Sequence, residues 1–343
     1  MTSSNNLPWL QPVVDAFQLG EPQRLTRLQT GQIQQTWQLE TNSAAYICQS
    51  LHPAFDKAVT EDAEAVSCYL SNQGFGIPRF MRTRQGDLHL DWQEQSWRVM
   101  NCLPGRSHRR APSAAYLQHA GRAAGHLHRL LSDFDHDFQF QLPNFHASEQ
   151  IWQQLFAHPS DPHVEFEWLF LIEQIPALLL PADLPRQIIH GDLKLTNFLF
   201  DEAGAVVGIV DLDTFMYHNL YVELGDALRS WCTAGEHFDL MALQASLEGY
   251  AEAGALHALD PGCLIAAIKL ITLELAMRYL IDYFEDCYFQ WDPAAYGSRC
   301  AHNLARCRRQ IAVYRDLVRQ HNELEQIVAA VFISEPRVVE VAV

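Results

Sequence analysis

The sequence predicts an α+β protein with two lobes, in which a small antiparallel sheet precedes a larger and mostly helical region. Three observations predict this class. Short β-leaning runs fill the first third of the 343-residue chain, and apolar residues recur at helical spacing through most of the rest. The helix-breaking segment 103–105 separates the strand-like pattern from the helical one. We therefore expect a first lobe at residues 1–104 and a second lobe at residues 105–343.

The first lobe should contain a strand meander, one helix and two further strands. Residues 24–51 form three β-leaning runs broken by turn residues, which predicts an antiparallel meander. Residues 55–74 place apolar side chains three or four positions apart and end on a glycine, so they should form a helix. Two short runs follow at 86–92 and 95–103, and we expect both to be strands.

The second lobe should be helical on both sides of one hairpin. Four stretches have apolar residues three or four positions apart: 111–131, 149–156, 165–180 and most of 240–331. Between these helical blocks, residues 198–215 predict a hairpin that turns at residues 201–204. The segment 332–343 is typical of an extended tail or a late strand.

Composition excludes several classes of partner. The net charge is −17, from 24 basic and 41 acidic residues, which opposes binding to nucleic acid or to an anionic membrane. A neutral or cationic small molecule is the partner that this charge favours. The apolar runs are too short to span a bilayer and the N-terminus has no secretory pattern, so we expect a cytoplasmic protein. Its eight cysteines, without a CxxC pair, should be reduced core thiols.

The stretch "IIHGDLKLTNFLF", residues 188–200, carries the clearest chemistry. Asp192 is followed five positions later by Asn197, and Asp211 comes fourteen positions after that, at the end of the predicted hairpin. Phosphoryl transfer needs a carboxylate that orients and deprotonates the attacking hydroxyl, together with oxygen ligands for Mg²⁺. The spacing is that of a kinase catalytic loop and of the metal-binding Asp that follows it.

The spacing therefore predicts a role for each polar residue of this stretch. Asp192 would be the general base, and Asn197 and Asp211 would bind magnesium. Lys194, two residues after the base, could steady the transferring phosphoryl group as a point charge. His190 is better suited to bracing the loop backbone than to chemistry.

These motifs resemble the aminoglycoside phosphotransferase and choline kinase family, small-molecule relatives of the protein kinases, over most of the chain. Segments 46–57, 188–200 and especially 208–231 ("GIVDLDTFMYHNLYVELGDALRSW") are most similar to the N-acetylhexosamine 1-kinase branch. That branch phosphorylates an amino sugar at its anomeric hydroxyl. The resemblance implies a protein-kinase-like fold, ATP and Mg²⁺ as cofactors, and a small hydroxyl acceptor as the partner.

The resemblance also implies roles for residues around the loop. Asp213 would support the metal site or bind the metal. Asp226 and Arg229 would lie near the active site and hold the loop or the acceptor, although a structural ion pair is an equally good reading. The linker 99–105 would stack against adenine.

Nucleotide contacts are implied on the first lobe too. Backbone groups around Asn101 and Cys102 would bond the adenine base, and Gly31 would lie in the first turn over the phosphates. The predicted third strand departs from the kinase pattern because it has no lysine to grip them. Gln49 is our candidate for that position, and Glu61 is the best match for the glutamate that normally pairs with the lysine.

The acceptor is left open by the residues. Choline, ethanolamine, homoserine and aminoglycosides are alternatives to the sugar that the resemblance implies. Aromatic residues within 277–291 could form a cage for a cation, but an aromatic stripe is more often core, and the acids there would suit a polycation. A non-catalytic nucleotide-binding scaffold is the alternative of another class, supported by the missing lysine and opposed by the retention of Asp192, Asn197 and Asp211. The oligomeric state is not predicted.

Overall fold

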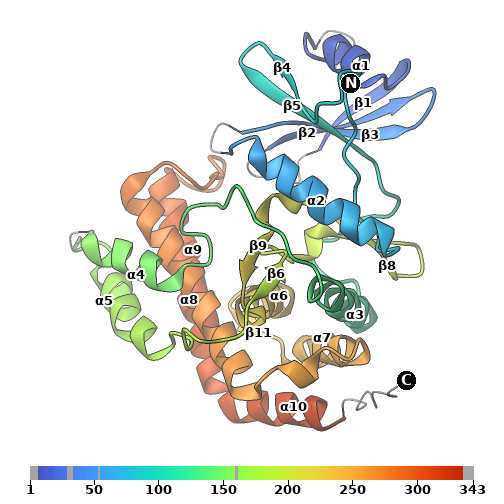
Figure 1. Ribbon diagram of the computed structural model, residues 1–343. Helices are drawn as coiled ribbons and strands as arrows, with labels where there is room; N and C mark the ends of the chain where they lie inside the picture. The colour runs from blue at the N-terminus through green and yellow to red at the C-terminus, as the bar shows by residue number, and fades with distance from the viewer. Residues whose placement is uncertain (1–6, 29–33, 53–54, 159–160, 335–343) are drawn as a thin grey trace.

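The computed structural model describes residues 7–28, 34–52, 55–158 and 161–334 and has the expected two lobes (Figure 1). The first lobe is built on a five-stranded antiparallel sheet in the order β1-β2-β3-β5-β4. Its strands are β1 (Pro22–Leu28), β2 (Gln35–Thr41), β3 (Ala45–Ser50), β4 (Leu90–Trp92) and β5 (Gln95–Asn101). The predicted meander and the two later strands are therefore confirmed.

Two helices flank this sheet. Helix α1 (Leu10–Phe17), which the sequence analysis did not predict, packs on one face, where Trp9 stacks on Trp97 with ring centroids 4.0 Å apart. Helix α2 (Ala58–Asn72) is the predicted helix, and Figure 1 shows it between the sheet and the second lobe. Its buried Val66 and Leu70 belong to the same core as α3, so α2 connects the packing of the two lobes.

The second lobe is mostly helical, as expected. Its helices are α3 (Ala114–Leu131), α4 (Ser148–Ala157), α5 (Glu165–Gln174), α6 (Leu220–Cys232), α7 (Leu240–Glu252), α8 (Pro261–Glu285), α9 (Arg299–Arg319) and α10 (His321–Ser334). Helices α3 and α7 approach closely because glycines face each other's backbone. A Cβ at Gly249 would lie 1.9 Å from the Gln118 carbonyl oxygen, and one at Gly121 would lie 2.0 Å from that of Ser246.

Short strands position the predicted catalytic loop between the helices. Strand β6 (Gln187–Ile189) pairs with β9 (Met216–His218), and β7 (Phe198–Phe200) pairs with β8 (Val206–Ile209) in the predicted hairpin. A further small pair is β10 (Thr233–Ala234) with β11 (His237–Phe238). The loop runs from β6 to β7, and Asp211 follows β8, so the two pairs bring both parts of the motif to one place.

Other expectations have mixed outcomes. The lobe boundary at residue 104 stays a prediction. Residues 332–334 end α10, and the rest of the predicted tail lies outside the described residues. All eight cysteines are free, but only Cys48, Cys232 and Cys307 are buried, so the expectation of core thiols was wrong for the others. In the described part of the chain, no helix is long and apolar enough to cross a membrane.

Candidate active site

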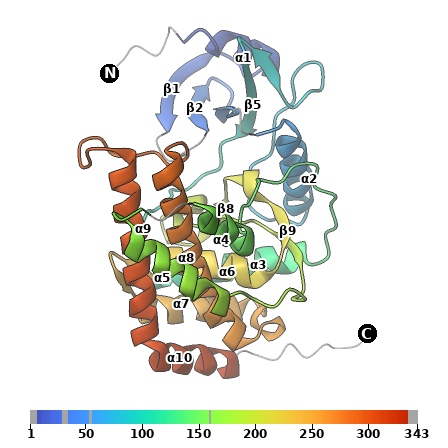
Figure 2. The ribbon, with the colours of Figure 1, turned by 90° about the vertical axis from the view of Figure 1, so that its left-hand side faces the viewer.

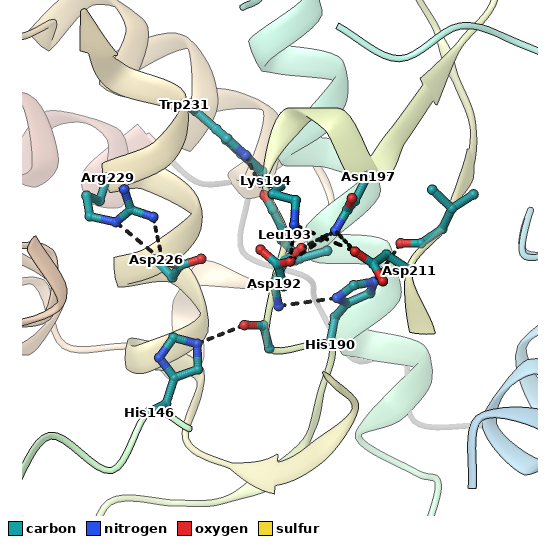
Figure 3. A network of polar contacts seen from close by, with 12 residues as sticks. His146, His190, Asp192, Leu193, Lys194, Asn197, Asp211, Asp226, Arg229 and Trp231 are labelled. Atoms are coloured by element: carbon teal, nitrogen blue, oxygen red, sulfur yellow. Dashed lines mark hydrogen bonds and ion pairs between the residues drawn. The ribbon is translucent and has the colours of Figure 1, made fainter. Parts of the chain in front are cut away.

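The loop between β6 and β7 and the segment after β8 bring four of the predicted residues together (Figure 3). The Lys194 ammonium contacts Asp192 Oδ2 and lies 3.6 Å from Asp211 Oδ2. Asn197 Nδ2 donates to the main-chain carbonyl of Asp192 at 2.8 Å and lies 3.4 Å from Asp211 Oδ2. Two carboxylates, one cation and one amide thus share a single small site.

The charges of this site act on one another. Burial raises the pKa of the Asp192 carboxyl, Asp211 and Asp226 raise it further, and Lys194 acts in the opposite direction, leaving a net increase. Burial would lower the pKa of Lys194, but Asp192 and Asp211 outweigh burial and raise it. Asp192 is therefore a stronger proton acceptor than an ordinary aspartate, and Lys194 is a fixed positive charge beside it.

Asn197 and Asp211 have the chemistry of magnesium ligands. Asn197 is buried and donates through Nδ2, which leaves its amide oxygen as the atom that could bind a metal. Asp211 adopts a left-handed backbone conformation, with φ of 72°, two residues after the end of β8. The described residues contain no group of three or more His, Cys, Asp or Glu side chains that could hold a metal ion. A site with few protein ligands suits Mg²⁺, which keeps several waters and binds substrate phosphates.

Buried groups that the sequence analysis missed hold the loop backbone. Glu223 on α6 accepts hydrogen bonds from the backbone N–H groups of His190 at 2.8 Å and Gly191 at 2.7 Å. Burial alone would raise the pKa of Glu223, but His128 and these hydrogen bonds lower it, so the carboxylate stays charged. His190 Nδ1 accepts the Asp192 N–H, and its Nε2 lies 3.1 Å from the Val210 carbonyl, which is the bracing role expected for this residue.

A second buried support of the loop is His146, which connects Glu274 of α8 to the loop backbone. His146 Nε2 lies 2.8 Å from the Gly191 carbonyl oxygen, and its Nδ1 lies 3.1 Å from Glu274 Oε1. Burial alone would lower the pKa of His146, but the hydrogen bond and charge of Glu274 raise it to about 9. The imidazole is therefore doubly protonated at neutral pH and donates in both directions.

This support predicts how stability depends on pH. The pKa of His146 is 6.5 when unperturbed and about 9 in the folded protein, so its contribution is complete below pH 6.5 and is lost as pH rises through 9. At about 1.4 kcal/mol per pKa unit, His146→Gln should remove about 3 kcal/mol of this pH-dependent stability. Urea unfolding at several pH values between 6 and 9.5 measures it. Glu274→Gln should flatten the curve in the same way, and an unchanged slope in both variants would contradict the assignment.

A cation does occupy the region of the missing lysine, and it comes from β5. Arg98 pairs in register with Gln49 of β3, and its Nε and Nη2 donate to Gln49 Oε1 at 3.1 and 2.8 Å. Its Nη1 donates to Thr60 Oγ1 on α2 at 3.0 Å, and its Nη2 donates to Asp213 Oδ2 at 2.7 Å. The Arg98 and Asp213 side chains are only 2% and 5% exposed, so the ion pair is buried. Arg98 therefore links the sheet, α2 and the segment after Asp211.

The α2 residue that reaches this region is Thr60, one position before the predicted Glu61. Glu61 is exposed, whereas Thr60 is buried and accepts a hydrogen bond from Arg98. Successive helix residues point in directions about 100° apart, so the inward position of Thr60 turns Glu61 outward. Asp213, predicted to support or bind the metal, also accepts from Gln34 Nε2 at 3.1 Å, which favours the supporting role.

The predicted adenine contacts around Asn101 and Cys102 stay a prediction, and the structure limits which backbone groups could make them. The Asn101 N–H donates to the Arg79 carbonyl at 3.1 Å, and the Cys102 N–H donates to the Ala45 carbonyl at 3.0 Å. Both backbone N–H groups therefore already have backbone partners, one in the segment before Phe80 and one at the start of β3. A base at this linker would have to bond carbonyl groups or residues beyond Cys102. Gly31 lies outside the described residues.

Asp226 and Arg229 form the predicted ion pair beside the loop. Arg229 Nη2 donates to Asp226 Oδ1 at 2.7 Å within α6, and Figure 3 shows the pair next to Asp192. Burial would raise the pKa of Asp226, but Arg229 lowers it. The pair is therefore structural and also close to the candidate base, so both earlier readings fit the geometry.

The two-lobed fold, with two carboxylates, a lysine and a buried amide gathered beneath the sheet, is that of a kinase-like phosphotransferase. The chain belongs to the phosphotransferase enzyme family APH, whose model matches residues 24–256. It is thus a phosphotransferase that acts on hydroxyl groups, and the family-level resemblance is confirmed.

Individual relatives are distant. A homoserine kinase of Methylocella silvestris is 25% identical over 284 residues, covering 80% of this chain and 85% of that protein. The solved amicoumacin kinase hAmiN, in complex with AMP-PNP, Ca²⁺ and Ami, superposes with a TM-score of 0.64 at 18% identity and covers 89% of this chain and 92% of that one. A microcompartment-associated aminopropanol kinase gives a TM-score of 0.62 at 14% identity, with coverage of 88% and 93%. These structures confirm the fold, and the N-acetylhexosamine branch stays a prediction.

Proposed function

We propose that this protein transfers the γ-phosphoryl group of ATP, with Mg²⁺, to a hydroxyl of a small acceptor. The observation that carries the proposal is the single contact set formed by Asp192, Lys194, Asn197 and Asp211. The AMP-PNP in the solved amicoumacin kinase supports ATP as the donor. On this proposal, residues 1–104 form the nucleotide lobe and residues 105–343 hold the catalytic loop and the acceptor.

Each residue of the contact set has a role in the transfer. Asp192 orients the acceptor hydroxyl and takes its proton as the oxygen bonds to the γ-phosphorus and the bond to the β-phosphate oxygen breaks, releasing ADP. Lys194, held between the two carboxylates, stabilises negative charge on the transferred group. Asn197 and Asp211 would hold Mg²⁺, which neutralises phosphate charge when bound. Asp226 and Arg229 would position the loop or the acceptor.

Two classes of acceptor have support. The resemblance of segments 46–57 and 208–231 to the N-acetylhexosamine 1-kinase branch favours a sugar or amino sugar. The names of the relatives favour a hydroxylated amine or amino acid, such as homoserine or aminopropanol.

Phosphorus NMR of the protein with Mg-ATP tests the proposal. The acceptors offered would be N-acetylglucosamine, N-acetylgalactosamine, simple hexoses, choline, ethanolamine, homoserine, aminopropanol and an aminoglycoside. A sugar 1-phosphate resonance supports the first class, and a phosphate ester of another acceptor keeps the mechanism but changes the substrate. Unchanged ATP with every acceptor, together with no measurable Mg-ATP binding, would favour the scaffold alternative.

A further inference from the structure

Two arginines and four aromatic rings form one cluster near the α8–α9 connection. The arginine–aromatic cluster consists of Phe145, Arg278, Tyr279, Tyr288, Phe289 and Arg306. The Arg278 guanidinium carbon lies 5.3 Å from the centroid of Phe145, 5.6 Å from that of Tyr288 and 5.7 Å from that of Phe289. The Arg306 guanidinium carbon lies 5.5 Å from the ring centroid of Tyr279 and 6.0 Å from that of Phe289. Guanidinium groups therefore already occupy faces of these rings.

The cluster lies next to the catalytic loop. A Cβ on Gly191 would lie 3.4 Å from Phe145 Cε1, so the Phe145 ring packs directly against the residue before Asp192. Arg278 is one turn after Glu274 on α8, and Glu274 reaches the Gly191 carbonyl through His146. Figures 1 and 2 show that the α8–α9 connection lies at the end of this helix pair that faces the first lobe. The acceptor on which Asp192 acts would therefore lie beside the cluster.

In the described part of the chain neither arginine of the cluster forms an ion pair within 4 Å, and Glu274, one turn before Arg278 on α8, interacts with it through charge alone. Arg278 bonds only the Tyr288 hydroxyl, at 3.4 Å, and Arg306 bonds only Asn303 Oδ1, at 3.2 Å. Glu274 uses its oxygens on His146 and Ser148. This is unusual in a chain whose net charge is −17, and it marks two cations that are available to a ligand.

Nearby acids are engaged elsewhere, so a cationic acceptor would find no open carboxylate among them. Asp282 accepts the backbone N–H groups of residues 287, 288 and 289 and a hydrogen bond from Asn303 Nδ2 at 2.7 Å. Glu285 contacts Gln154 and His158, and Asp286 contacts Arg299. Choline or a polycationic aminoglycoside would meet guanidinium groups on these rings instead of free π faces.

We propose that Arg278 and Arg306 bind an anionic group of the acceptor, specifically a carboxylate carried a few bonds from the hydroxyl that is phosphorylated. Planar guanidinium groups held on aromatic faces present paired N–H donors that match a carboxylate. A neutral sugar would leave both guanidinium groups without an ion-pair partner. This inference rests on the proposed function and narrows its acceptor to a hydroxylated carboxylic or amino acid, although the overall charge of the chain favours a neutral or cationic partner.

Matched acceptors and variants test the inference. L-Homoserine and 3-aminopropan-1-ol differ by the carboxylate alone. Glycerate and glycerol form a second pair, in which one terminal carbon is either a carboxylate or an alcohol. The wild-type protein should have the lower KM for the carboxylate of each pair that it phosphorylates. Arg278→Met and Arg306→Met should each raise that KM by at least about tenfold, leave the KM for ATP unchanged and abolish the preference within the pair. Arg278→Lys keeps the charge but loses the planar guanidinium. Its KM for the carboxylate acceptor should lie between those of the wild type and Arg278→Met.

Arg315→Met is the control, because Arg315 lies 5.1 Å from the ring centroids of Phe166 and Phe170, neither of which belongs to the cluster. It should leave both KM values unchanged, and circular dichroism should confirm that all variants are folded. Turnover of neutral or cationic acceptors only, or equal KM values in wild type and both cluster variants, would overturn the inference and keep the proposed function. Unchanged ATP with every acceptor would overturn both.

Discussion

Asp192→Asn should lower kcat by at least about a hundredfold, the usual contribution of a general base, while the fold and nucleotide binding persist. Asparagine has the size of aspartate but cannot take the hydroxyl proton. Lys194 keeps a carboxylate nearby, because Asp211 Oδ2 lies 3.6 Å from its ammonium. The loop backbone is held by Glu223 and His146, which the change does not touch.

Steady-state kinetics with the best acceptor from the NMR screen, with thermal unfolding and Mg-ATP titration alongside, measures this effect. Asp183→Asn, at an exposed site outside the loop, is the matched control and should behave as wild type. Because the base must be deprotonated, wild-type kcat/KM should rise with pH through the pKa of Asp192, which burial raises. Near-normal turnover of Asp192→Asn would show that another group is the base.

The sequence predicted that the residues of the candidate catalytic loop come together, because its parts are local. Asp192, Asn197 and Asp211 lie within twenty positions, and one hairpin with familiar turn chemistry is enough to bring them together. The meander and α2 were predicted for the same reason, since their spacing and turn residues are local signals.

The supports were missed because they depend on contacts between distant segments. Glu223 lies 33 residues from His190, and Glu274 lies 128 residues from His146. The only local signal for Arg98 is a single charged residue in the apolar run "WRVM", and nothing in the sequence pairs it with Asp213, 115 positions away. The aromatic stripe was ambiguous because Phe145, which joins it to the loop, comes from a different segment.

Arg98→Met should lower the free energy of unfolding by about 3–5 kcal/mol, the cost of leaving a buried charge without its partner. Asp213 Oδ1 already has no hydrogen-bond partner in the described part of the chain, so losing Arg98 would leave the carboxylate with Gln34 alone. Asp213→Asn in the Arg98→Met background removes that buried charge and should recover part of the loss. Urea unfolding of the four proteins of this cycle measures the coupling.

The same change should also affect nucleotide use, because Arg98 fixes the segment that follows the metal-binding candidate Asp211. It is too buried to contact phosphates, so it acts as a positioning residue in the region where kinases usually have a phosphate-gripping lysine. We expect Arg98→Met to raise the Mg²⁺ concentration needed for half-maximal activity. Arg98→Lys, which keeps the charge, should raise this concentration less. Thr60→Val, which removes only the α2 hydrogen bond, should keep the wild-type Mg²⁺ requirement with a stability loss of about 1 kcal/mol. If Arg98→Met is destabilised but its Mg²⁺ requirement is unchanged, the role of Arg98 is only to join the two lobes.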